Sequence, residues 1–85
     1  MMAVTVRLPV MLRRGSDTLT VTEPVHSIAQ LVEVLGRIQP DLPSQLDDAI
    51  FNFAVNDEML THGVDHHPIK DGDVVEIVPA ISGGG

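Results

Sequence analysis

Residues 74–79, which read VVEIVP, restrict the fold of this chain more than any other segment. The segment is apolar at both alternating sets of positions, with Glu76 as its one polar residue. A strand with one wetted face alternates apolar and polar residues, whereas a strand that is apolar on both sides lies inside a sheet. The sequence therefore predicts a central β-strand over residues 74–79.

Three glycines follow this strand, after Ala80, Ile81 and Ser82. Glycine has no Cβ, so a glycine segment can pass through a channel too narrow for other residues, and the carboxylate of Gly85 is unhindered. From Ala80 to Gly85, an extended arm spans roughly 20 Å. Chain ends also carry glycine without any function, so the tail alone leaves its role open.

Two segments near the N-terminus alternate in the manner of strands. They are residues 3–9 (AVTVRLP) and 18–22 (TLTVT), and turn residues at 13–17 separate them. We therefore expect a β-hairpin. Its inward-facing residues would be Val4, Val6, Leu8, Leu19 and Val21.

The segment from Ser27 to Gln39 has helical periodicity and stops before a proline. Ser27 is one candidate for the N-cap residue, and His26 is the other, because Gln30 occupies a capping-box position. Gly36 weakens the last turn by up to about 1 kcal/mol relative to alanine. The apolar stripe of this helix would consist of Ile28, Leu31, Val32, Leu35 and Ile38.

The second half of the chain predicts shorter elements. Residues 41–50 predict a short helix, 51–56 a strand, 58–60 a brief return strand, 61–68 a loop, and 70–73 a tight turn. The short helix would open at Pro43 or Ser44. The inward residues of the short helix would be Leu42, Leu46 and Ile50. Those of the strand would be Phe51, Phe53 and Val55. In the tight turn, Gly72 would take a positive φ.

This order of elements predicts an α+β domain, in which a main helix crosses one face of a mixed sheet of four to five strands. The central strand must then turn one set of apolar residues away from the helix, either Val74 and Val78 or Val75 and Ile77. An uncovered apolar patch suits docking of a partner protein, and we assign this role to Val74 and Val78. Coverage of the patch by the short helix and loops is the alternative.

Composition excludes several classes of function. Twelve acidic residues against five basic ones give a net charge of −7, which disfavours nucleic acid and anionic membranes and favours a basic partner protein. The chain has no cysteine, so any sulfur chemistry would have to use the main-chain carboxylate. No apolar run reaches the ~20 residues that span a bilayer, and no signal peptide is evident, so we expect a cytoplasmic protein.

The chain resembles the ubiquitin-like β-grasp sulfur carriers. The resemblance covers essentially the whole chain and is carried by the predicted hairpin and helix, Ala54-Val55-Asn56, the turn Lys70-Asp71-Gly72-Asp73, the strand Val74–Pro79 and the terminal glycines. That family includes the small subunit of molybdopterin synthase (MoaD), the thiamin sulfur carrier (ThiS) and the carrier of cysteine synthesis (CysO). The resemblance implies a β-grasp domain at residues 1–80 and a flexible tail at 81–85.

The resemblance also implies a cycle in which an ATP-dependent, ubiquitin-activating-like enzyme adenylates the terminal glycine. Sulfur transfer then converts its carboxylate to a thiocarboxylate, which donates sulfur to the substrate of a second enzyme. Here the acceptor would be Gly85, with Gly83 and Gly84 as the narrow thread behind it. Many members end in two glycines, so Gly84 after trimming is the alternative terminus. The carrier itself would be neither an enzyme nor a cofactor-binding protein.

Residues 41–50 lengthen the chain beyond the usual thiamin carrier. The resemblance therefore favours the small subunit of molybdopterin synthase or a carrier for cysteine synthesis, with the large subunit of molybdopterin synthase as the expected sulfur-accepting partner. A ubiquitin-like modifier conjugated to lysines is a further alternative. A β-grasp interaction module with an irrelevant tail is the third.

Other candidate sites carry weaker signals. His62, His66 and His67 match no metal-binding motif, so we expect a solvated loop and no metal site. The acidic pairs Asp47-Asp48 and Asp57-Glu58 are expected to be solvated surface; if they have a function, we expect them to steer a basic partner. Lys70 is the only lysine and would be the one internal site for isopeptide attachment.

Overall fold

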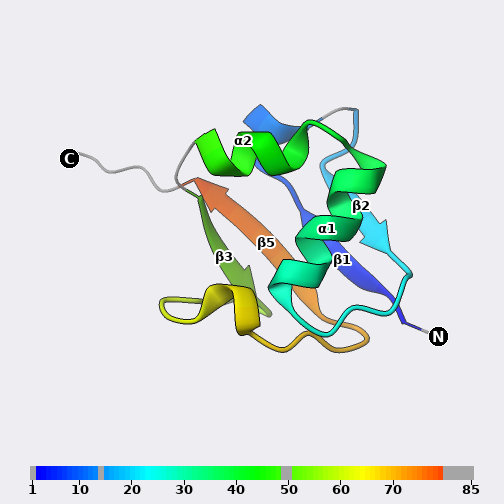
Figure 1. The fold of residues 1–85 in the computed structure, drawn as a ribbon, viewed down its shortest axis with the longest axis vertical. Coiled ribbons are helices and arrows are strands. Elements are labelled where there is room, and N and C mark those ends of the chain that lie inside the picture. The colour runs from blue at the N-terminus through cyan, green and yellow to red at the C-terminus, as the bar shows by residue number, and fades with distance from the viewer. Residues whose placement is uncertain (1, 14, 49–50, 80–85) are drawn as a thin grey trace.

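Strand β5 (Val74–Pro79) lies at the centre of a five-stranded sheet in the computed structural model. It pairs in parallel with β1 (Val4–Arg7) and antiparallel with β3 (Phe51–Val55). Strand β2 (Thr18–Val21) forms an antiparallel hairpin with β1, and β4 (Glu58–Met59) pairs antiparallel with β3, so the order is β2-β1-β5-β3-β4. Figure 1 shows the strands β2, β1, β5 and β3 in this order. The central strand, the hairpin and the mixed sheet are thus confirmed.

The structure describes residues 2–13, 15–48 and 51–79. The predicted tail at 81–85, with Gly83, Gly84 and Gly85, lies outside the described residues, as does Ile50. Within the described parts of the chain, no helix is both long enough and apolar enough to cross a membrane.

Helix α1 (Ile28–Ile38) crosses one face of the sheet, as Figure 1 shows. Val75 and Ile77 of β5 are fully buried on that side, together with the alternate residues of β1. Val74 is exposed and Val78 is half-buried on the opposite face. The two alternatives for the apolar set that faces away from the helix are therefore resolved in favour of Val74 and Val78.

The start of α1 is capped by Ser27, not His26. The Ser27 hydroxyl accepts a hydrogen bond from the Gln30 N–H at 3.3 Å, and the Gln30 side chain accepts one from the His26 N–H at 2.7 Å. Both bonds satisfy N–H groups that precede or open the first turn, which have no partner inside the helix.

The predicted apolar stripe of α1 is wrong at its C-terminal end. Ile38 is 49% exposed, while Val34, which the sequence analysis omitted, is buried. The buried stripe consists of Ile28, Leu31, Val34 and Leu35. The buried stripe therefore ends at Leu35, and Ile38, the last residue of α1, lies in solvent.

The short helix α2 (Leu42–Asp48) confirms the prediction for residues 41–50, although it begins at Leu42, one residue before Pro43. Leu42 is fully buried, and Leu46 packs against the core. Gly36 of α1 faces Pro43, because a Cβ built on Gly36 would lie 2.8 Å from Pro43 Cγ. The glycine that weakens α1 locally therefore lets the two helices approach.

Replacing Gly36 with alanine is expected to destabilise the protein, despite alanine's higher helix propensity. Propensity alone would stabilise by about 1 kcal/mol, but the methyl group overlaps a rigid proline ring, and overpacking typically costs about 1–3 kcal/mol. Urea denaturation measures the difference. In a Pro43→Ala background the clash is absent, so Gly36→Ala should then be neutral or stabilising; destabilisation of equal size in both backgrounds would contradict the packing explanation.

The turn that precedes β5 is fixed by the side chain of Asp73, which is buried. Its two carboxylate oxygens accept hydrogen bonds from the Lys70 N–H at 2.8 Å and from the Asn56 side-chain amide at 3.0 Å. The Asn56 side-chain oxygen in turn accepts one from the Val74 N–H at 2.9 Å, and the Asp73 carbonyl accepts one from the Thr5 N–H at 3.1 Å. This network joins the starts of β1 and β5 to the end of β3.

Two of the turns beside the strands adopt left-handed backbone. Gly72 has a φ of 88°, as predicted for the tight turn. Asn56 and Asp57 have φ values of 51° and 71°, the conformation of a two-residue hairpin loop, and they connect β3 to β4.

Candidate functional site

The C-terminal end of β5 is where the chain leaves the described fold toward its glycines. Pro79 is the last described residue, and it lies opposite Phe51 in the register of β5 and β3. The other side of β5 at this end faces the end of β1 and a 3-10 turn, η1 (Val10–Leu12). A pocket of about 280 Å³ lies between them.

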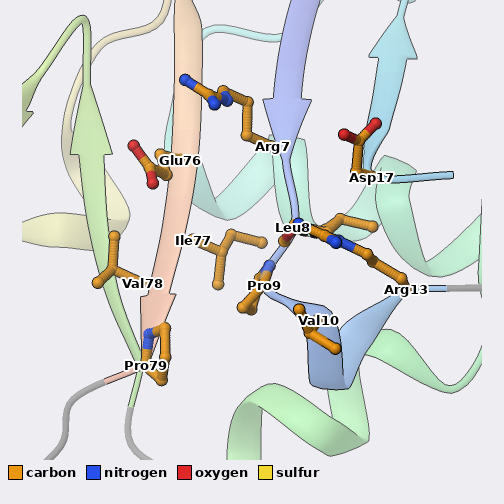
Figure 2. A pocket seen from close by; sticks show the side chains of 10 residues that line it. All are labelled: Arg7, Leu8, Pro9, Val10, Arg13, Asp17, Glu76, Ile77, Val78 and Pro79. Carbon is orange, nitrogen blue, oxygen red and sulfur yellow. Dashed lines mark hydrogen bonds between the residues drawn. The ribbon is translucent and has the colours of Figure 1, made fainter.

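The pocket is lined by both apolar and charged side chains (Figure 2). Its apolar lining comes from both strands and from η1, and comprises Leu8, Pro9, Val10, Ile77, Val78 and Pro79. Its charged residues are Arg7, Arg13, Asp17 and Glu76. The Arg13 Nε–H donates a hydrogen bond to the Leu8 carbonyl at 3.1 Å, which holds that guanidinium at the pocket.

The candidate docking residues Val74 and Val78 occupy the sheet face opposite α1. Val78 lies beside Asn52 of β3 in the register and also lines the pocket. Val74 lies at the other end of β5, beside Thr5 of β1. Val78 therefore belongs to the region from which the tail departs, and Val74 is separated from it by the length of the strand.

Sequence reasoning missed η1. Its residues Val10 and Met11 are 75% and 60% exposed, the highest values among the large exposed hydrophobic side chains of the described residues. The signal in the sequence is the apolar run Leu8–Leu12, which continues past the end of the strand alternation and contains a proline. Proline lacks the N–H that a strand would use, so the chain leaves the sheet there.

The remaining candidates do not converge on a site. No group of three or more possible metal-ligating side chains occurs among the described residues, and the predicted loop that holds His62, His66 and His67 contains a second 3-10 turn, η2 (Val64–His66). Asp57 and Glu58 are exposed in the β3–β4 hairpin, and Lys70 is exposed at its turn. The side chains of Asp47 and Asp48 lie outside the described parts of the structure.

The arrangement of the helix, the sheet and the last strand defines a class of protein. One main helix across a mixed sheet, with a central last strand that runs out of the fold toward a C-terminal glycine sequence, is the ubiquitin-like β-grasp arrangement.

The family model of the ThiS family matches residues 6–84. The chain therefore belongs to the ThiS family of small, non-catalytic sulfur carriers. The comparison with curated proteins returned no match.

A solved structure shares this fold. It is described as a protein–protein complex of subunits 1 and 2 of molybdopterin-converting factor from Helicobacter pylori 26695. The similar chain has 24% sequence identity and a TM-score of 0.67, and the match covers 98% of the present chain and 100% of the other. This confirms the β-grasp fold.

Proposed function

We propose that this sulfur carrier acts through the main-chain carboxylate of Gly85. The observation that carries the proposal is the position of β5, which is anchored on both edges and ends at Pro79, only a few residues before the glycines. A rigid body that ends in this way gives the tail, and the unhindered carboxylate at its end, a fixed point of attachment. Gly83 and Gly84 would let that carboxylate enter a narrow active site.

The chemistry takes place on partner enzymes. An adenylating enzyme of the ubiquitin-activating type brings the Gly85 carboxylate to the α-phosphate of ATP, and pyrophosphate leaves as the acyl adenylate forms. A sulfide equivalent from a sulfur donor then attacks the acyl carbon and displaces AMP. The product is a thiocarboxylate, in which one oxygen of Gly85 has been replaced by sulfur.

The accepting pathway that we propose is molybdopterin synthesis, with the large subunit of molybdopterin synthase as the second partner. The structure with the shared fold supports this choice, because its description names two subunits of molybdopterin-converting factor in a complex. Carriers for thiamin or cysteine synthesis use the same terminal chemistry and differ in the enzyme that accepts the sulfur. Assays with each purified acceptor distinguish them.

Val78 and Val74 are proposed to dock against these partners. Both present apolar surface on the sheet face that α1 leaves uncovered, and Val78 lies at the departure point of the tail. Burial of such surface contributes roughly 25 cal/mol per Å². Charge would contribute to the encounter, because a chain with a net charge of −7 attracts a basic partner surface.

Incubation with the cognate adenylating enzyme, ATP and sulfide tests the proposal. Intact mass spectrometry should show a gain equal to the replacement of one oxygen by sulfur, located on Gly85 by fragmentation. A Val78→Asp variant should need a concentration about tenfold higher for half-maximal loading, because a charge is forced into the apolar contact. An unchanged mass for the wild-type chain would contradict carrier function at Gly85, and covalent adducts on lysines would favour a protein modifier instead.

A further inference from the structure

We propose that η1 and the adjacent pocket form a second docking element for the adenylating enzyme. This element binds an apolar recess on the enzyme, and a carboxylate of the enzyme flanks that recess. This inference rests on the proposed function, since it concerns the enzyme that receives the tail. It adds a contact that the sheet face does not provide, from residues between the first two strands.

The exposed side chains of η1 form an apolar protrusion. Val10 and Met11 are adjacent in sequence and retain 75% and 60% of their surface in solvent. Isolated exposed hydrophobic residues are ordinary, but two neighbours on one turn make a contiguous patch, and Val10 also lines the pocket beside Pro9 and Val78. Methionine adapts its shape to partner surfaces because its side chain is unbranched and polarisable.

The protrusion is held rigidly from beneath. Leu12, the last residue of η1, is 2% exposed and belongs to the core. Its N–H donates to the Pro9 carbonyl at 2.9 Å, and its carbonyl accepts a buried hydrogen bond from the Gln39 side-chain amide at 2.8 Å. Because η1 is tied in this way to the end of α1, presenting Val10 and Met11 costs little ordering entropy on binding.

Arg13 supplies the positive charge that pairs with the carboxylate on the enzyme. Its Nε–H bonds to the Leu8 carbonyl, and within the described residues it forms no ion pair with Asp17 or Glu76, the acidic residues of the pocket. Glu76 instead lies beside Arg7 in the register of β1 and β5. The Arg13 guanidinium keeps its terminal N–H groups available, and their planar fork matches a carboxylate.

The position of the pocket indicates that its partner is the adenylating enzyme. Val78 and Pro79 form its wall on the β5 side, and the chain leaves for its glycines from Pro79 (Figure 2). An enzyme that draws Gly85 to ATP therefore holds this end of β5 within the reach of the extended tail, roughly 20 Å. The contact is continuous with the docking surface proposed at Val78, and adenylation is required whichever pathway accepts the sulfur.

Binding measurements with the purified adenylating enzyme test the proposal, with full-length variants of this chain. We expect Arg13→Glu to raise the Kd by about tenfold or more, since it places like charges together, and the double variant Val10→Ser, Met11→Ser to raise it by about tenfold. The adenylation rate at saturating carrier should stay within about twofold of wild type, because a docking contact that is equally strong before and during reaction changes affinity alone.

Two matched controls separate docking from general effects. Arg37→Glu makes the same charge change at an arginine that pairs with Glu23 on α1's side of the sheet, and Met59→Ser removes an exposed methionine from the opposite sheet edge. Both should leave the Kd within about twofold of wild type. Circular dichroism and thermal unfolding check that every variant is folded.

The outcomes distinguish this inference from the proposed function. If wild-type carrier is adenylated but the η1 variants bind as tightly as the controls, the inference is wrong and the carrier function stands. If the Arg13 and Arg37 variants weaken binding equally, the effect is net charge and the inference is also wrong. Failure of the enzyme to adenylate the wild-type chain would overturn both.

Discussion

Deletion of Gly85 is expected to reduce sulfur loading by at least about 100-fold and to leave the stability of the fold unchanged. The deletion withdraws the carboxylate by about 3.5 Å, whereas displacement of a reacting group by about 1 Å can already cost 100-fold in rate. The free energy of unfolding should not change, because every core residue and hydrogen bond of the described fold precedes Ala80. Loading is measured by mass spectrometry and stability by urea denaturation.

Companion variants make this result specific. Gly84→Val restores the length and the terminal glycine but adds a branched side chain to the thread, so it should also lose loading if a narrow channel receives the tail. If the chain without Gly85 loads normally while the chain without Gly84 and Gly85 does not, the functional terminus is Gly84. That result would contradict our assignment of Gly85 without removing the carrier function.

Replacing Asp73 with alanine is expected to destabilise the protein by about 3 kcal/mol, because it removes two hydrogen bonds to a buried carboxylate and leaves the Lys70 N–H and the Asn56 amide without their acceptor. A domain of this size typically has only about 5–15 kcal/mol of stability. At about 4–8 °C for each kcal/mol, the Tm should fall by about 12 °C or more.

Asp71→Ala is the matched control for Asp73→Ala. It removes a carboxylate two residues away that accepts one exposed hydrogen bond, from the Ala3 N–H at 2.8 Å. Because water replaces an exposed partner, we expect a loss of no more than about 1 kcal/mol. Similar losses for the two variants would show that the Asp73 network does not stabilise the junction of β1, β3 and β5.

The Asp73 network gives a physical reason for two motifs that carried the family resemblance. Ala54-Val55-Asn56 and Lys70-Asp71-Gly72-Asp73 are distant in sequence, but Asn56 and Asp73 bond to each other in the folded chain. Asn56 also tolerates the positive φ of the hairpin turn and accepts a bond from the first N–H of β5. These motifs therefore build the end of β5 that lies away from the tail, and they anchor the strand from which the tail extends.

Sequence reasoning identified the elements whose signals are local. The hairpin, the main helix, the short helix after it and the central strand could be predicted because periodicity, capping residues and turn residues all lie within a few positions of one another. The predicted stripe of α1 was wrong at Ile38 because helical spacing does not show how far along the helix the core extends. Gly36 was interpreted as a local weakness because Pro43, the residue that requires it, meets it only in the tertiary structure.

The sequence alone predicted the hairpin, the main helix and the central strand, and its resemblance to the β-grasp sulfur carriers indicated the class of protein. Tertiary structure decided which face of that strand is open and what surrounds its end. The sequence did not distinguish Val74 and Val78 from Val75 and Ile77 as the buried set. The packing of α1 on one face of the sheet buries Val75 and Ile77. Val10 and Arg13 lie beside the end of β5 only because β1 pairs with it in parallel, a long-range pairing that local periodicity cannot specify.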